Sequence, residues 1–167
     1  MYSQMIPLGT PCPSFTLPGI DGKTHSLDSF ADEAVLVVIC MCNHCPYVQA
    51  EWAGFVTLQR DFEDRGVRFI GINGNDAGNF TEDSFEKMKE YAEKYRMNFP
   101  YLFDETQRTV RAFGAVCTPD IFAYGQDRTL AYRGRLDDLR DALDALLREE
   151  APNPDQKPSQ GCSVKWK

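Results

Sequence analysis

The stretch that decides the fold is Ala34-Val-Leu-Val-Val-Ile-Cys40, followed directly by Met41-Cys-Asn-His-Cys-Pro46. The first part is a continuous, β-branched apolar run of strand length, typical of a strand that is covered on both faces. After it, apolar residues recur at helical spacing until Gly66, which is placed to end a helix. These residues are Val48, Trp52, Phe55 and Phe62. The pattern predicts a central strand, a tight turn that holds two cysteines, and a helix.

The rest of the chain predicts further strands and helices around that central strand. Val67-Arg-Phe-Ile-Gly-Ile72 is the next strand, at a distance that suits a parallel βαβ crossover. Asp83, with Glu86 three residues on, forms a capping box that predicts a second helix. The remaining predicted elements are a small N-terminal hairpin (13–22), a helix (105–113) that ends at Gly114, a hairpin (120–124 and 129–132) and a last helix with Leu136, Leu139, Leu143 and Leu146 facing inward.

Composition and charge indicate one globular domain that does not bind nucleic acid. The chain has 167 residues, 43% hydrophobic and 26% charged. We expect the domain to cover residues 1–150. Residues 151–167, with three prolines and no hydrophobic period, are expected to form a tail that is mobile or draped on the domain. The net charge of -7 and the pI of about 4.8 argue against the basic face that nucleic acid requires.

The cysteines and the first residues bear on the compartment. Residues 1–10 contain no positively charged segment and no apolar run of signal-peptide length, and no stretch approaches the roughly 20 apolar residues of a membrane span. We therefore expect a cytoplasmic protein without a membrane partner. Three of the six cysteines, Cys40, Cys42 and Cys45, fall within six positions. Such crowding favours chemistry over a framework of structural disulfides.

The Cys42-Asn-His-Cys45 turn predicts thiol-disulfide exchange. A thiol is a nucleophile only as the thiolate, and the first turn of a helix stabilises that anion. The sequence predicts Cys42 in this first turn and Cys45 one turn further. Cys42 would then attack a disulfide, and Cys45 would resolve the mixed disulfide. We accordingly expect Cys42 to be the accessible thiol of low pKa and Cys45 the shielded one.

The same cysteine spacing also occurs in metal sites. A zinc site needs a second cysteine pair or further histidines, and the only histidine besides His44 is His25. A soft metal such as Cu(I), held by Cys40, Cys42, Cys45 and His44, is another alternative. The junction of a buried strand and a helix favours the redox interpretation, with no cofactor and no resident metal. Cys40 alternates onto the opposite side of the strand, where we expect it to be a small buried apolar residue.

Residues around the cysteine pair are expected to support it. Asn43 and His44 lie between the two cysteines, and an imidazolium at His44 would favour the Cys42 thiolate. An equally weighted alternative is that His44 faces solvent or a substrate. Thr118-Pro119 stands at the entrance to a strand, where a proline is expected at an edge or after a cis bond. A cis-proline turn would expose its preceding backbone to an extended substrate, whereas a trans-proline would simply begin the strand.

Six blocks along the chain match the pattern of one group of proteins. They are 9–17 with Asp21-Gly22, 41–48, 99–107, 113–120, 132–138 and 158–166. Together they resemble the thioredoxin superfamily, and specifically the peroxiredoxin-like proteins of the AhpC/TSA redoxin type that carry a thioredoxin-type CxxC motif. The resemblance implies an α/β thioredoxin fold, with a central mixed β-sheet flanked by helices and an N-terminal β-hairpin extension.

The resemblance also implies an activity and its residues. It implies a thiol-disulfide oxidoreductase in which Cys42 attacks, Cys45 resolves and Pro119 is the cis-proline that faces them. Its partners would be protein dithiols or disulfides and an unidentified electron donor. We expect the chain to be a monomer or a weak homodimer.

Departures from the family pattern leave a second function open. In peroxiredoxins the peroxide-attacking cysteine aligns with Cys45, a Thr or Ser aligns with Cys42, and an arginine near the cis-proline strand completes the site. No arginine lies between Val116 and Tyr124. A thiol peroxidase that uses Cys45 is therefore the alternative function. The buried carboxylate of thioredoxin is replaced by Leu36, so no proton acceptor for Cys45 is identified.

Two more cysteines lie near the ends of recognisable segments. Cys117 precedes Pro119 by two residues and could be a further exchange partner of Cys42, although we favour a packed thiol. In the tail, Trp166 supplies an apolar anchor. We expect the tail to pack on the domain through Trp166, with Cys162 structural and not required by the redox pair.

Overall fold

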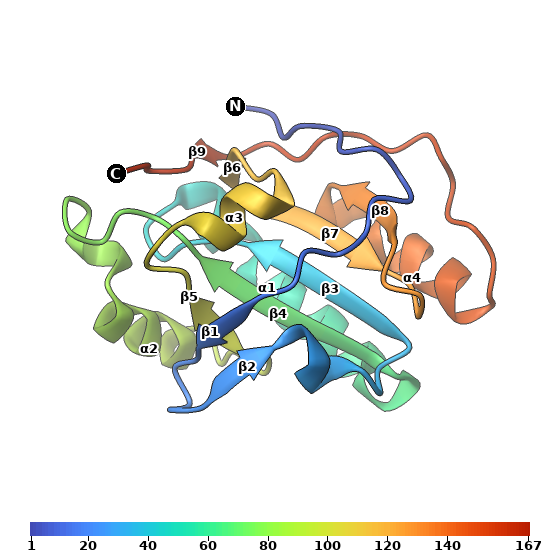
Figure 1. Ribbon diagram of the computed structural model, residues 1–167, viewed down its shortest axis with the longest axis horizontal. Helices are drawn as coiled ribbons and strands as arrows, with labels where there is room; N and C mark the ends of the chain where they lie inside the picture. The colour runs from blue at the N-terminus through green and yellow to red at the C-terminus, as the bar shows by residue number, and fades with distance from the viewer.

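The computed structural model describes residues 1–167 as a five-stranded sheet with helices on both faces (Figure 1). The strands are β1 (Thr16–Pro18), β2 (Thr24–Ser26), β3 (Val35–Cys40), β4 (Val67–Asn73), β5 (Tyr101–Phe103), β6 (Cys117–Thr118), β7 (Asp120–Tyr124), β8 (Leu130–Gly134) and β9 (Cys162–Ser163). The helices are α1 (Pro46–Phe62), α2 (Phe85–Lys94), α3 (Arg108–Phe113) and α4 (Leu139–Leu147), with 3-10 turns η1 (Leu27–Phe30), η2 (Glu63–Arg65), η3 (Thr81–Asp83) and η4 (Leu136–Asp138).

The central sheet is mixed, in the order β5-β4-β3-β7-β8. β3 pairs in parallel with β4, and β4 with β5, whereas β7 is antiparallel to both β3 and β8. The predicted parallel crossover, the β7–β8 hairpin and the small β1–β2 hairpin are confirmed. No pattern predicted the short strand β5 or the two-residue strands β6 and β9.

The alternation of β3 divides the core into two layers. All six residues of β3 are buried, as the apolar run predicts. Val35, Val37 and Ile39 pack with residues of α1, α2 and α4 on one face. Leu36, Val38 and Cys40 pack on the other face with α3 and the N-terminal segment. The cysteine turn directly follows the last residue of this strand, so it is anchored to a strand that is packed on both faces.

Two predicted helix starts are wrong by a few residues, and both errors concern the site. α1 begins at Pro46 and Cys45 is its N-cap residue, so Cys42 lies before the helix instead of in its first turn. Pro46 favours this start because its fixed φ suits the first helical position. α2 begins after Ser84, whose hydroxyl accepts the Lys87 N–H, so Asp83 is not the cap. Asp83 is instead free to bind the cysteine turn.

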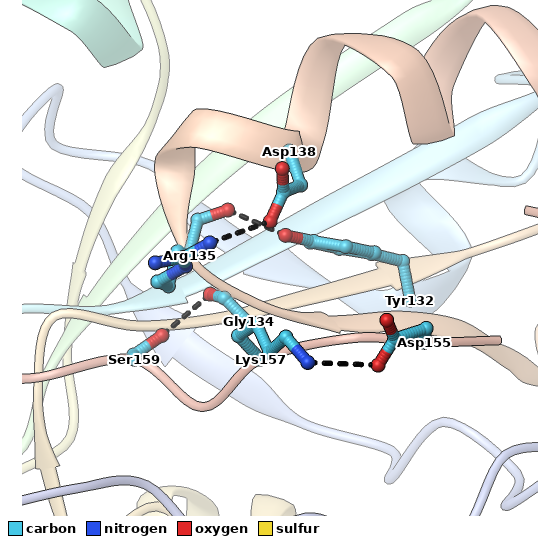
Figure 2. Close-up of polar contacts among 7 residues, drawn as sticks. All are labelled: Tyr132, Gly134, Arg135, Asp138, Asp155, Lys157 and Ser159. Carbon is cyan, nitrogen blue, oxygen red and sulfur yellow. Dashed lines mark hydrogen bonds and ion pairs between the residues drawn. The ribbon is translucent and has the colours of Figure 1, made fainter. Parts of the chain in front are cut away.

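The tail, residues 151–167, runs back along the domain, passes beside the N-terminal segment and ends near the start of α3 (Figure 1). Its short strand β9 pairs antiparallel with β6. Figure 2 shows how the tail is held just before β9, where the Ser159 hydroxyl donates to the Gly134 carbonyl oxygen. Ser159 also exchanges hydrogen bonds with Ser3, whose N–H donates to Ser159 O at 2.9 Å. None of the helices combines the length and apolarity that a membrane span requires.

Candidate active site

The site lies where β3, α1, the β6 loop and the tail strand β9 meet. Cys42 and Cys45 are each only 1% exposed. The predicted cis bond between Thr118 and Pro119 is present, and the Thr118 hydroxyl lies 3.3 Å from Cys42 Sγ. As a thiol, Cys45 donates to the Thr118 carbonyl oxygen at 3.4 Å. Thr118 and Pro119 therefore face both cysteines, as the sequence predicts.

Cys45, and not Cys42, has the low pKa. The main influence on Cys45 is a hydrogen bond from the Cys42 thiol. Burial opposes ionisation, but further hydrogen bonds from Cys162 and from the Val48 N–H outweigh it, and the pKa of Cys45 falls to about 4. The pKa of Cys42 is raised well above its usual value by the hydrogen bond to Cys45, by burial and by the Asp83 carboxylate. This order is the reverse of the predicted one, because Cys42 donates its hydrogen bond to Cys45 and because burial and the Asp83 carboxylate oppose ionisation of Cys42.

Asp83 fastens the cysteine turn. Its Oδ1 accepts the backbone N–H groups of Asn43, at 2.8 Å, and of His44, at 3.1 Å. Its Oδ2 accepts from Asn75 Nδ2 at 2.9 Å. The side chain is almost completely buried. One carboxylate therefore holds the backbone between the cysteines, and its charge adds to the effects of the Cys45 hydrogen bond and of burial that raise the pKa of Cys42.

The two residues between the cysteines differ in role. The Asn43 side chain is buried, accepts from Tyr101 Oη at 2.8 Å and donates to the Glu82 carbonyl at 2.9 Å. The His44 side chain is exposed and forms no hydrogen bond with either sulfur. Asn43 thus fixes the conformation of the turn through its hydrogen bonds. His44 faces solvent, which was one of the two alternatives for its position.

The tail brings a third sulfur to the pair. Cys162 Sγ lies 2.8 Å from Cys45 Sγ, although 117 residues separate them along the chain. Cys162 pairs with Thr118 in the β6–β9 register. Trp166 packs on the domain as expected, with the Arg111 guanidinium 4.0 Å from the centre of its ring. This position places Cys162 beside the redox pair, and whether it is structural or reactive stays a prediction.

The other cysteines lie apart from this group. Cys40 packs with the second core layer, on the face of β3 opposite Cys42 and Cys45, as predicted. It cannot bind one ion together with those two, and no group of three or more His, Cys, Asp or Glu side chains is arranged to hold a metal ion. Cys117 is fully buried and hydrogen bonds to no other sulfur, as expected of a packed thiol. Burial raises its pKa to about 12.

Two carboxyl groups near the site have raised pKa values. Asp120 is buried without a hydrogen-bond partner, and burial raises its pKa well above the usual value. Burial, followed by the charges of Asp137 and Cys45, raises the pKa of Glu51 to about 7. Glu51 lines a cavity of about 240 Å³ between α1 and the tail, together with Tyr47, Arg135, Asp137, Ser159 and Gln160. Glu51 therefore lies within electrostatic range of the Cys45 thiolate and can hold a proton near neutral pH.

The pKa of Cys45 predicts how the thiolate absorbance of the reduced protein depends on pH. Because this pKa is lowered from 9.0 to about 4, the ultraviolet absorbance of one thiolate should persist through neutral pH and vanish only as the pH falls through about 4. Cys45→Ser should remove this signal, and Cys12→Ser, which removes a partly exposed thiol elsewhere, should leave it unchanged. A signal lost in Cys42→Ser but retained in Cys45→Ser would contradict the assignment.

The fold and the site define a redox protein of the thioredoxin fold. Residues 8–133 match the model of the AhpC/TSA family. The chain belongs to this family, and the resemblance stated from the sequence is confirmed. It is 31% identical over 102 residues to a chloroplastic peroxiredoxin Q of Populus jackii, a match that covers 61% of this chain and 44% of that protein.

Two solved structures show how far the similarity of fold extends. An uncharacterized conserved protein from Geobacillus kaustophilus has a TM-score of 0.97 and 40% identity, over 100% of this chain and 96% of that one. The thioredoxin domain of a thiol-disulfide oxidoreductase from Bacteroides vulgatus has a TM-score of 0.74 and 17% identity, over 86% and 99%. The first comparison includes the tail, and the second shows the fold alone.

Proposed function

We propose that the chain is a thiol peroxidase in which the Cys45 thiolate attacks a peroxide. The observation that carries the proposal is the position of Cys45 as the N-cap of α1, facing Thr118 and the cis-proline and surrounded by donors that lower its pKa. In peroxiredoxins the peroxide-attacking cysteine occupies this position. The thiolate sulfur attacks one peroxide oxygen, the O–O bond breaks, and Cys45 becomes a sulfenic acid while the other oxygen leaves as an alkoxide or hydroxide. A thiol then condenses with the sulfenic acid to a disulfide and water.

Cys42 serves this reaction as a donor. Its pKa is raised, so it remains a thiol, and its hydrogen bond to Cys45 is the largest influence on the Cys45 thiolate. A hydroxyl of Thr or Ser occupies this position in peroxiredoxins, and a thiol can donate in the same direction. In this role Cys42 donates a hydrogen bond and does not attack the peroxide.

The leaving oxygen needs a proton, and Glu51 is our proposed source. A thiolate of low pKa is fully ionised but intrinsically less nucleophilic, so ionisation alone gives little net acceleration. Rapid reaction therefore depends on groups that stabilise the leaving oxygen. The cavity lined by Glu51 and Arg135 provides an acid and a cation. Arg135, which directly follows β8, would supply the positive charge that is missing between Val116 and Tyr124.

Protein disulfide exchange through Cys42 and Cys45 is the second candidate, supported by the CxxC spacing and by the cis-proline. A protein substrate would need the exposed backbone beside Pro119. Here the tail strand β9 already pairs with that edge, and Cys162 occupies the place opposite Cys45. A small peroxide does not need this edge. We further propose that the protein works in the cytoplasm and that an external dithiol is its electron donor.

The rate of peroxide reduction and its pH profile test the proposal. With excess dithiothreitol, the reduced protein should consume hydrogen peroxide, and the single-turnover rate should fall as pH rises through about 7, because Glu51 loses its proton there. Glu51→Gln should be slower and should lose this pH dependence. The control is Glu86→Gln, an exposed acid on α2, which should behave as the wild type does. Slow peroxide reduction combined with rapid reduction of insulin disulfides would favour the second candidate.

A further inference from the structure

The backbone of the tail positions Cys162 at the redox pair. Gly161 precedes it, and a Cβ at this position would collide with the Thr118 carbonyl oxygen, so only glycine allows the tail to approach so closely. The Gly161 N–H and carbonyl oxygen exchange hydrogen bonds with Met1, at 2.9 and 3.0 Å. The Val164 N–H donates to the Val116 carbonyl at 3.0 Å. Contacts on both sides of Cys162 therefore hold its sulfur against Cys45.

The segment that follows Cys162 is held as firmly. The Lys165 N–H donates to Asn75 Oδ1 at 3.0 Å, and Gln107 Nε2 donates to the Lys165 carbonyl at 2.9 Å. Asn75 is also the residue that donates to Asp83. The tail and the cysteine turn therefore share one hydrogen-bond network, and the contact between Cys45 and Cys162 is not the chance approach of a loose end.

We propose that Cys162 is the thiol that resolves the Cys45 sulfenic acid. In the resulting disulfide, Cys162 is also the sulfur that an external dithiol attacks at the protein surface. The proposal rests on the peroxidase function proposed above. The Cys162 sulfur attacks the Cys45 sulfur, the S–O bond breaks, and a Cys45–Cys162 disulfide and one water form. An external dithiol then attacks the Cys162 sulfur, releases the Cys45 thiolate, and becomes a disulfide when its second thiol displaces Cys162.

Oxidation of Cys45 favours Cys162 over Cys42 as the attacking group. In the reduced protein, burial and then the hydrogen bond and charge of Cys45 raise the pKa of Cys162 to about 11, and Lys165 lowers it. A neutral sulfenic acid no longer exerts the effect of that charge. Cys42 would still be opposed by its burial and by the Asp83 carboxylate. Cys162 therefore becomes the more easily ionised of the two neighbours.

The direction of reduction follows from exposure and from the leaving group. Cys162 is partly exposed, whereas Cys45 is only 1% exposed. The thiolate of lower pKa leaves faster in an exchange reaction. An incoming thiolate should therefore attack Cys162 and expel Cys45.

Peptide mapping of protein oxidised with one equivalent of hydrogen peroxide tests the inference. In wild type and in Cys42→Ser, the dominant disulfide should join Cys45 to Cys162. In Cys162→Ser, trapping of the Cys45 sulfenic acid by dimedone should increase at least about tenfold, because the resolving thiol is absent. Cys12→Ser, which removes another partly exposed thiol, should match the wild type in both readouts. A limiting monothiol should leave its adduct on Cys162 and not on Cys45.

The outcomes separate this inference from the proposed function. A dominant Cys42–Cys45 disulfide in wild type, with unchanged dimedone trapping in Cys162→Ser, would overturn the resolving role while the peroxidase function stands. The absence of any peroxide-dependent modification of Cys45 in all variants would overturn both. Gly161→Val gives an independent check, because it should push β9 from Thr118 and reduce the yield of the Cys45–Cys162 disulfide without removing a sulfur.

Discussion

Cys45→Ser is expected to abolish peroxide reduction, with a loss of at least about 10³-fold in the second-order rate constant, because it removes the nucleophile itself. Cys42→Ser should retain the reaction to within about tenfold, because the serine hydroxyl can donate the same charge-assisted hydrogen bond to the Cys45 thiolate. Stopped-flow measurement of hydrogen peroxide reacting with the reduced proteins gives both constants.

Cys42→Ala refines this comparison. It removes the donor without supplying another, so the Cys45 pKa should rise and the rate constant should fall further than in Cys42→Ser. Matching circular dichroism spectra would show that the variants remain folded. A Cys42→Ser protein as inactive as Cys45→Ser would instead restore the original prediction from the sequence, in which Cys42 attacks.

Asp83→Ala is expected to lower the free energy of unfolding by about 3–5 kcal/mol. The substitution leaves the buried N–H of Asn43, the N–H of His44 and the amide of Asn75 without their acceptor, and each unsatisfied buried donor costs about 1–3 kcal/mol, with incomplete additivity. Urea denaturation of the reduced proteins measures the difference. Asp83→Asn should cost less than Asp83→Ala, because its remaining oxygen can still accept both backbone N–H groups.

A matched control distinguishes this role from a general effect of charge. Glu86→Ala removes an acid from the exposed first turn of α2, close in sequence to Asp83, and should change stability by less than about 0.5 kcal/mol. Asp83→Asn should in addition lower the pKa of Cys42, because the opposing carboxylate charge is gone. An Asp83→Ala protein as stable as Glu86→Ala would show that the turn is held by other contacts.

The elements with local signals could be predicted from the sequence. β3, α1 and the β7–β8 hairpin agree with the prediction, because burial on two faces gives a continuous apolar run and burial on one face gives a regular apolar spacing. The tail strand β9 has no such period. It forms by pairing with β6, far away along the chain, and these two short strands make a sheet of their own.

The site also combines features that the sequence predicts with features that depend on tertiary contacts. The sequence by itself determined that two cysteines separated by two residues stand at a strand–helix junction, and the family resemblance added the cis-proline opposite them. Only the tertiary structure decided which donors and charges surround each sulfur and which third sulfur Cys45 meets. Those outcomes depend on Asp83, 40 residues from Asn43, and on Cys162, 117 residues from Cys45. A pKa depends on the donors and charges around a group in space, and no spacing along the chain encodes contacts made over such distances.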